Sequence, residues 1–388
     1  MFYLFLGKYK WRMKKALVFF LCLYCFAACK SEKTLPFLDI ERMQADNCDL
    51  LDDSPGYLIM NYGASFLDST FRFQPDEIGK MMVYGGNLYL LAKGELRCYE
   101  FPSGKLTLRF RSPHPVISFA LDTLDGSLYA LDTEQAELLR FSSDGIKQGG
   151  MPLDKSYGYR DISCLGDGRL LLTTDGFPDP YLFRIPAFGQ SPVRLLSPKK
   201  ERERQLLPDS LACPLEVIGR GGNGLLYKYL LNDTLYMLKG DSCRPLFTCE
   251  MGNKKVRLGN KKQLLKENDR LCITGIWETK DYWWIQYRCN ILVKEIRYRY
   301  TSMGILYKNL SIKESGYTFF IPDQTIVMNT RKPLYMNEEG TCFVQVYNPE
   351  DHLKDGKREL PFNLEQDRDS GNLILNYFYI KELKKKKI

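Results

Sequence analysis

The chain has 388 residues, of which 44% are hydrophobic, 26% are charged and 13% are aromatic, with a formal net charge of +8. These fractions are typical of a folded globular protein and exclude a disordered or fibrous chain. The length exceeds that of an ordinary single domain unless the architecture is built from repeats. The 25 Tyr and 22 Phe residues favour strands over helices.

Residues 1–28 are predicted to be a signal peptide, and translation is expected to start at Met13. Lys14 and Lys15 precede the apolar run Ala16–Ala28, which is too short to span a bilayer comfortably. The sequence Phe26-Ala27-Ala28-Cys29 is similar to a bacterial lipobox, in which the cysteine becomes the lipidated first residue. We therefore expect Cys29 to anchor the protein in the bacterial cell envelope, at the outer membrane, on its periplasmic or surface face. The alternative is an ordinary secretory signal or an apolar N-terminal helix with an accidental cysteine.

Removal of the signal peptide changes the charge of the chain. Residues 1–28 hold five basic and no acidic residues, so the net charge falls from +8 to +3. Much of the remaining excess lies at the C-terminal end, where residues 384–388 form a basic tail. A charged run of this kind is usually a solvated end, and it gives no support to nucleic-acid binding.

The cysteines predict neither a disulfide framework nor a zinc ribbon. Cys22 and Cys25 belong to the signal peptide, and the nine cysteines after Cys29 are scattered without a C-x-x-C pair. Cys98 and Cys272 lie in apolar runs, where a cysteine behaves as a small buried hydrophobe.

Repeated short strands are the main structural signal. Residues 29–54 are polar and are predicted to be a tether, and residues 55–383 are predicted to fold. The stretch Val116–Gly145 contains three short strand-like runs separated by Asp-Gly turns and a polar break, which is typical of an antiparallel meander. Similar copies cover Lys80–Phe110 and Asp161–Leu196. After the charged break Lys199–Arg204, three further copies are expected within residues 215–249, 271–300 and 326–380.

The spacing of the copies predicts the architecture. The turn glycines Gly86, Gly126 and Gly168 stand 40 and 42 residues apart, which matches one four-stranded propeller blade per copy. No amphipathic helix longer than about three turns is predicted, so an α/β fold is disfavoured. The predicted fold is an all-β, six-bladed β-propeller, with seven blades as the runner-up.

Several motifs resemble a known family. They are the lipobox, the strand starts GNLYLL and GSLYALD, the runs Phe101–Gly104 and Phe141–Gly145, and the final LILNYFYIKEL. Together they resemble the six-bladed propeller lipoproteins of Bacteroidales, which are distantly similar to NHL and TolB-like propellers. The resemblance covers about Tyr57 to Leu383. It implies an envelope location and a propeller, and it implies no chemistry.

Two motifs suggest chemistry but have simpler explanations. Gly219–Gly224 satisfies G-x-G-x-x-G, yet a dinucleotide site needs a following helix, and the next residues are predicted to form two strands. The chain has only two histidines, His114 and His352, which are too few for a histidine-based zinc site. No G-x-S-x-G segment accompanies them, so a Ser-His-Asp triad is not indicated. We expect a glycine-rich turn and exposed loop histidines.

Carboxylates at turns leave a metal site open. Asp122, Asp125 and Asp132 belong to one copy, and Asp175 and Asp179 belong to another. Calcium in the central channel of lactonase-like propellers is held by such oxygens. Asp is also the ordinary residue of a tight turn, and these residues show no fixed ligand spacing. No metal or cofactor is therefore predicted.

The most unusual local chemistry is a set of aromatic and basic residues that we call the aromatic platform. It consists of Tyr282, Trp283, Trp284, Arg297 and Arg299. Large aromatic residues usually pack between blades. The functional alternative is a surface that binds a glycan or an acidic partner.

The sequence therefore predicts an envelope-anchored binding or scaffold module, not an enzyme. Propellers present loops from every blade, which makes a broad recognition surface without a catalytic group. The expected ligand is a glycan or an envelope protein, and the expected oligomeric state is monomeric. The alternative is a Ca²⁺-dependent, lactonase-like or lyase-like propeller enzyme that uses the turn aspartates.

Overall fold

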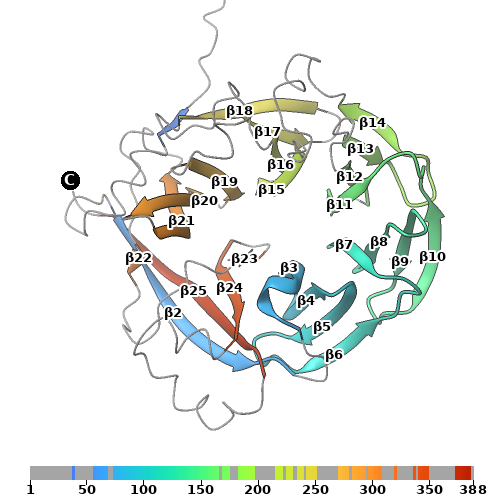
Figure 1. The fold of residues 1–388 in the computed structure, drawn as a ribbon, viewed down its shortest axis with the longest axis horizontal. Coiled ribbons are helices and arrows are strands. Elements are labelled where there is room, and N and C mark those ends of the chain that lie inside the picture. Colours follow the sequence, from blue (N-terminus) through green and yellow to red (C-terminus); the bar gives the residue numbers. More distant parts are fainter. Residues whose placement is uncertain are drawn as a thin grey trace, which may run out of the picture. The chain divides into compact units, whose positions relative to one another are not determined.

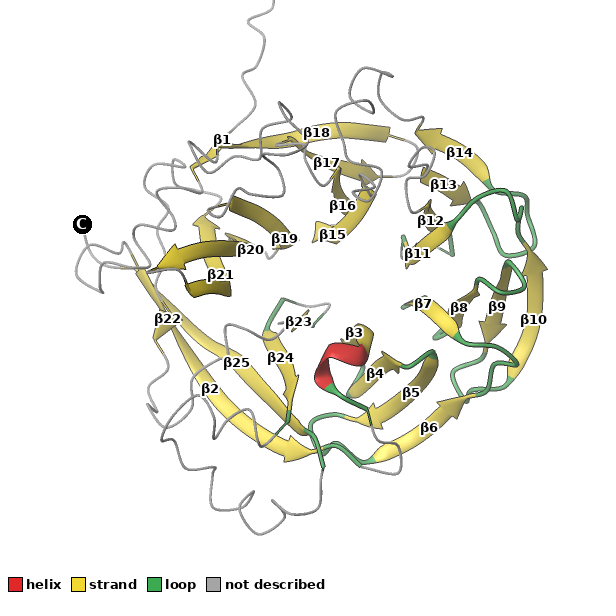
Figure 2. Ribbon diagram, viewed as in Figure 1, coloured by secondary structure: helices red, strands yellow, loops and turns green. Residues whose placement is uncertain are grey.

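Five β-sheets make up the fold in a computed structural model that describes part of the chain. The described residues are 37–39, 56–68, 73–165, 168–174, 182–196, 215–221, 224–229, 234–239, 242–250, 270–278, 282–293, 296–307, 319–320, 335–337, 340–348 and 372–385. Their only helical element is the short 3-10 turn η1 (Pro75–Glu77), so the predicted all-β fold is confirmed (Figure 2). No helix in these ranges has the length and apolar character needed to cross a membrane.

Three of the sheets are four-stranded antiparallel meanders. Figure 1 shows their first strands, β3, β7 and β11, nearest the centre, and their last strands, β6, β10 and β14, at the periphery. The bounds are β3 (Ile78–Tyr84), β4 (Asn87–Ala92), β5 (Glu95–Glu100), β6 (Leu106–Phe110), β7 (Val116–Leu121), β8 (Leu128–Asp132), β9 (Glu137–Phe141), β10 (Lys147–Pro152), β11 (Tyr159–Cys164), β12 (Leu170–Thr174), β13 (Leu182–Ile185) and β14 (Val193–Leu196).

Glycine makes the turns between first and second strands. Tyr84 pairs with Asn87, so Gly85 and Gly86 alone form the connection, and both have positive φ angles, +57° and +74°. A two-residue hairpin turn requires this conformation, which glycine adopts without steric cost. The predicted turn glycines Gly126 and Gly168 also have positive φ angles.

The middle strands pack on both faces. All five residues of β8 are buried. Tyr129 and Leu131 join a core shared with the β11–β14 sheet, whereas Leu128 and Ala130 join a core shared with the β3–β6 sheet. Because side chains alternate across a strand, one meander fills two neighbouring cores, which is the face-to-face packing of propeller blades.

A five-stranded sheet joins segments from both ends of the described chain. Gly56–Phe66 of β2 pairs antiparallel with Ile374–Lys385 of β25, and a core cluster packs this sheet against the β3–β6 sheet. This pairing removes two long strand edges that would otherwise be exposed. The remaining strands are β22 (Phe319–Phe320), β23 (Tyr335–Met336) and β24 (Cys342–Tyr347).

The fifth sheet has eight strands, and it corrects the predicted number of blades. Six blades were predicted, with seven as the runner-up, whereas the strands in the described ranges form five sheets. The eight-stranded sheet contains two meanders that are joined by a short parallel pairing of β15 with β19. Its strands are β1 (Phe37–Asp39), β18 (Ser242–Glu250), β17 (Thr234–Lys239), β16 (Gly224–Tyr229), β15 (Leu215–Gly221), β19 (Arg270–Glu278), β20 (Tyr282–Val293) and β21 (Ile296–Tyr307).

Glycines lie where these two meanders merge. The pairing joins Gly219 to Ile276 and Arg220 to Trp277. Gly219 and Gly275 follow the register breaks of β15 and β19, so neither strand carries a side chain at that position. A glycine inside a strand often marks a bulge or a place where another backbone approaches closely.

The eight-stranded sheet also contains the G-x-G-x-x-G segment and part of the predicted tether. In the G-x-G-x-x-G segment, Gly219–Gly221 belong to the end of β15 and Gly224 begins β16, so a strand follows it and not the helix that a dinucleotide site needs. Within the predicted tether, residues 37–39 form β1, which pairs in parallel with residues 248–250 of β18. The other tether residues up to 54, the signal peptide and the tail residues 386–388 lie outside the described ranges.

Candidate functional site

The innermost strands share a structural irregularity. In β3, β7, β11, β15 and β19 the pairing register shifts by one residue, immediately before Lys80, Ser118, Asp161, Gly219 and Gly275 respectively. Such a β-bulge re-aims the neighbouring side chains. One bulge therefore recurs at the corresponding place in five strands.

Three of these bulge residues form a polar cluster across three sheets. The Lys80 ammonium donates to Asp161 Oδ1 at 2.7 Å, to the carbonyl oxygen of Ile162 at 2.6 Å and to Ser118 Oγ at 3.2 Å. Ser118 Oγ donates to Asp161 Oδ1 and accepts a hydrogen bond from the Ile162 N–H at 3.2 Å. We call these three residues the clamp, because they join the innermost strands of three sheets.

The hydrogen bonds of the clamp are those of a structural contact. Lys80 Nζ donates all three of its hydrogen bonds, to Asp161 Oδ1, to the carbonyl oxygen of Ile162 and to Ser118 Oγ. A general base for Ser118 would need a neutral amine with a free lone pair. The clamp therefore positions strands, and it supplies no activated nucleophile in this arrangement.

The turns of these sheets interlock at one end of the meanders. Tyr84 OH donates to the carbonyl oxygen of Thr123 at 3.1 Å, which joins the β3–β4 hairpin to the β7–β8 turn. The Phe101 N–H donates to the carbonyl oxygen of Gly86 at 2.8 Å, which adds the β5–β6 turn. A Cβ built on Gly126 would lie 3.3 Å from Ser143 Cβ, so the β9–β10 turn touches the β7–β8 turn. We call this end the turn face.

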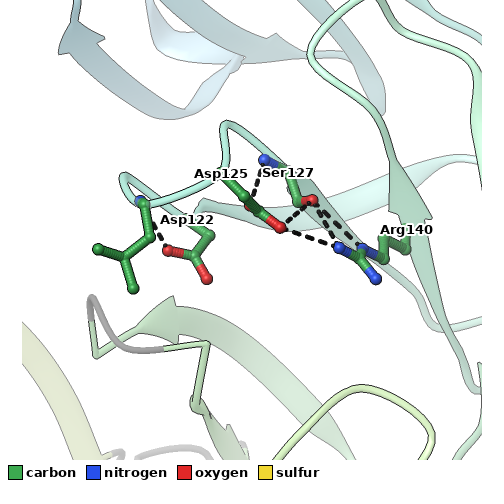
Figure 3. Close-up of polar contacts among 5 residues, drawn as sticks. Asp122, Asp125, Ser127 and Arg140 are labelled. Atoms are coloured by element: carbon green, nitrogen blue, oxygen red, sulfur yellow. Dashed lines mark hydrogen bonds and ion pairs between the residues drawn. The ribbon is translucent and has the colours of Figure 1, made fainter.

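Hydrogen bonds hold the β7–β8 turn in place (Figure 3). Asp122 Oδ1 accepts the N–H of Leu124 at 3.0 Å. Asp125 accepts the N–H and the hydroxyl of Ser127 at 2.8 and 2.9 Å, and Arg140 Nη2 donates to the same carboxylate at 3.0 Å. Partial burial raises the pKa of Asp125, but these bonds and the Arg140 charge outweigh it and lower the pKa overall. The carboxylate is thus ionised and fixed at neutral pH.

Two large aliphatic side chains project from these fixed turns. Leu124 is 71% exposed and Ile146 is 63% exposed. The β9–β10 turn is held by a hydrogen bond from the Ser142 N–H to the carbonyl oxygen of Ile146 at 3.0 Å. The Ser142 hydroxyl donates to Asp144 Oδ1, and this bond lowers the pKa of Asp144. Turn positions usually carry polar residues, so exposed aliphatic side chains on two touching turns are unexpected. We call Leu124 and Ile146 the tips.

The predicted turn carboxylates that the structure describes accept hydrogen bonds within their own turns. Asp122 and Asp125 accept the hydrogen bonds given above, and Asp132 Oδ1 accepts the N–H of Gln135 at 3.1 Å. Asp175 and Asp179 lie outside the described ranges. Among the described residues, no group of three or more His, Cys, Asp or Glu side chains could hold a metal ion.

The structure places the aromatic platform on one long hairpin. Trp283 pairs with Leu306 and Trp284 with Ile305, whereas Arg297 pairs with Leu292 and Arg299 with Asn290. Leu292 lies eight positions after Trp284 in β20, or roughly 25 Å along the strand. Tyr282 pairs with Tyr307, at the tryptophan end. Trp283 is buried, and a ligand role for the five residues stays a prediction.

The remaining residues that the sequence singled out lie partly inside and partly outside the described ranges. His114 Nδ1 lies 3.1 Å from Glu134 Oε2, at the surface. Cys98 is buried as predicted, and Cys164 and Cys342 are also buried thiols. Cys29 and His352 lie outside the described ranges, so lipid attachment at Cys29 stays a prediction.

Comparisons with known proteins agree on the fold. No family model and no curated protein matches the sequence. The structure is similar to that of a Bacteroides fragilis protein described as exported, with a TM-score of 0.57 and 15% identity over 87% of this chain and 98% of that chain. It is also similar to a DUF4221 family member from Bacteroides vulgatus, with a TM-score of 0.52 and 11% identity over 84% and 97%. Virginiamycin B lyase from Staphylococcus aureus gives a TM-score of 0.45 and 10% identity over 83% and 100%.

The architecture and the first two likenesses define the class. The chain is a β-propeller protein whose sheets pack face to face. At these identities the likenesses show the fold alone, so the function has to be argued from the residues of this chain.

Proposed function

We propose that this protein is an envelope-anchored binding module that recognises its partner with the turn face. The observation that carries the proposal is the pair of exposed aliphatic tips, Leu124 and Ile146, on two touching turns. Burial of a leucine or isoleucine side chain stabilises a complex by about 1.5–3 kcal/mol. Because hydrogen bonds already fix these turns, a partner would lose little affinity to ordering them.

The clamp supports the same proposal. It joins β3 and β7, the innermost strands of the two sheets whose turns form the turn face, to each other and to β11, so the positions of these strands are fixed at the centre of the meanders. A rigid scaffold that carries binding residues on its turns is the usual arrangement of a recognition surface. The proposal needs no catalytic group.

The envelope location is a separate part of the proposal. It is supported by the signal-like residues 14–29 and by the structural likeness to a protein described as exported. Mass spectrometry of the N-terminal peptide from native membranes tests it. We expect a diacylated or triacylated Cys29 at the mature N-terminus, and an unmodified peptide that begins upstream of Cys29 would contradict the anchor.

The binding role is tested by co-purification from native envelopes. Wild-type protein is expected to retain a partner in a stoichiometric amount, and the double variant Leu124→Ser/Ile146→Ser is expected to lose it while its thermal unfolding is unchanged. Val193→Ser is the matched control, because Val193 is also an exposed aliphatic residue, at 44%, but lies in β14. Equal retention by wild type and double variant would contradict a role for the turn face.

A further inference from the structure

We infer that the partner of the turn face is a protein segment that combines apolar side chains with Lys or Arg residues, and not a glycan. This inference rests on the function proposed above and names the chemistry of its partner. It depends on three features of the two tips: their side-chain type, the hydrogen bonds already made by hydroxyl groups in the same turns, and the charged residues near them.

The side-chain type favours an apolar partner. Sugars are recognised by stacking on flat aromatic rings together with hydrogen bonds to their hydroxyls, whereas Leu124 and Ile146 offer branched aliphatic surface. An aliphatic side chain gains free energy mainly by removal from water, which a partner's own apolar side chains provide. Because the two turns touch, a single segment can cover both tips.

Two hydroxyl groups of the turns, those of Ser127 and Ser142, already have hydrogen-bond partners. Ser127 Oγ donates to Asp125 and accepts from Arg140 Nη2 at 2.9 Å, and the Ser142 hydroxyl donates within its own turn. A glycan needs donors and acceptors that can exchange water for sugar hydroxyls. In the described part of these two turns, such exchange would break hydrogen bonds that hold the tips in place, which costs about 1–3 kcal/mol for each group left unsatisfied.

The charge beside the tips favours a basic segment. Leu124 is followed by Asp125, and Ile146 lies two residues after Asp144 and directly before Lys147, so each tip has a carboxylate near it in the chain. Arg140 compensates Asp125, and Lys147 Nζ lies 3.9 Å from Glu137 Oε2, whereas Asp144 accepts a hydrogen bond from the neutral Ser142 hydroxyl. A Lys or Arg of the partner beside Asp144 would add a favourable contact at the rim of the interface and speed association.

The test uses two synthetic amphipathic peptides with the same apolar face, one carrying lysine and the other glutamate, and measures binding by calorimetry. The lysine peptide is expected to bind wild-type protein at least tenfold more tightly than the glutamate peptide. Leu124→Ser/Ile146→Ser is expected to weaken binding of the lysine peptide by tenfold or more, Asp144→Asn by about two- to fivefold, and Val193→Ser not at all. Binding should also weaken with added salt.

Two outcomes separate this inference from the proposed function. Equal binding of both peptides, or unchanged binding by the double variant, would overturn the inference. If a photo-crosslinker at position 124 joins a glycan in native envelopes, the inference fails and the binding function stands. If the same crosslinker joins nothing, both fail.

Discussion

Lys80 Nζ lies 2.7 Å from Asp161 Oδ1, although 81 residues separate the two in the chain. The contact runs from the first strand of one sheet to the first strand of the sheet after next, and Ser118 of the intervening sheet bonds to both. The side chains of Lys80 and Asp161 are only 24% and 29% exposed, so solvent screens this pair less than a surface ion pair. The clamp therefore couples three blades at their inner edge.

Substitutions in the clamp are expected to lower the free energy of unfolding. Ser118→Ala removes the acceptor of the buried Ile162 N–H and is expected to lower the free energy of unfolding by about 1–3 kcal/mol. Lys80→Met is expected to cost about 1–2 kcal/mol, because Asp161 loses its cationic donor. Urea denaturation of both variants and of Lys105→Met, an exposed lysine, measures these effects.

A double-mutant cycle checks that the clamp acts as one unit. The combination Lys80→Met/Asp161→Asn is expected to cost less than the two single losses added together, with a coupling of about 1 kcal/mol. Strict additivity would show that the two side chains do not stabilise each other in solution.

A glycine pair tests the packing of the turn face. Gly104 has a φ angle of +76°, and a Cβ built on it would lie 2.2 Å from the carbonyl oxygen of Phe66. Gly86 has a φ angle of +74°, and its Cβ would meet nothing within 4 Å. We expect Gly86→Ala to cost about 1 kcal/mol for conformation alone and Gly104→Ala about 3 kcal/mol or more, because backbone must also move.

Urea denaturation of the two alanine variants measures the difference. If both lose the same stability, then the β5–β6 turn does not dock against β2 as the structure has it.

A buried tyrosine predicts how stability falls at alkaline pH. Burial, followed by the neighbouring Cys98, raises the pKa of Tyr89 from 10.0 to about 12. Because the folded state holds the proton more tightly than the unfolded state, this contribution is complete below pH 10 and is lost as the pH rises from 10 to 12. Tyr89→Phe cannot ionise and is expected to reduce the alkaline loss by up to about 2 kcal/mol.

Denaturation at a series of pH values measures this effect. The slopes of stability against pH for wild type and Tyr89→Phe should coincide below pH 9 and separate above pH 10. A common slope throughout would show that Tyr89 titrates normally.

The sequence predicted most strands of the first three meanders but missed β10. The turn glycines and the alternating runs carry a strong local signal, which Gly86, Gly126 and Gly168 confirm by their positive φ angles. β10 has Gly149, Gly150 and a terminal proline, so its strand propensity is weak. Gly150 pairs with Leu139 of β9, and this long-range pairing is not visible in the local sequence pattern.

The clamp and the tips escaped sequence analysis for different reasons. Lys80, Ser118 and Asp161 occupy one position of three blades, but their chemical types differ, and only the tertiary structure brings them together. Leu124 and Ile146 beside Asp-Gly turns were visible in the sequence as aliphatic residues at polar positions. The aspartates around Leu124, Asp122 and Asp125, are typical both of tight turns and of metal ligands, and neither pattern indicates a role for an aliphatic neighbour.

Site-specific photo-crosslinking in living cells tests the binding account most directly. A photoreactive residue is placed at position 124 on the turn face and, in a second strain, at position 193 on β14. The account predicts one discrete protein adduct from position 124, abolished by Ile146→Ser, and no adduct from position 193. Absence of any adduct at 124, or the same adducts from both positions, would contradict recognition through the turn face.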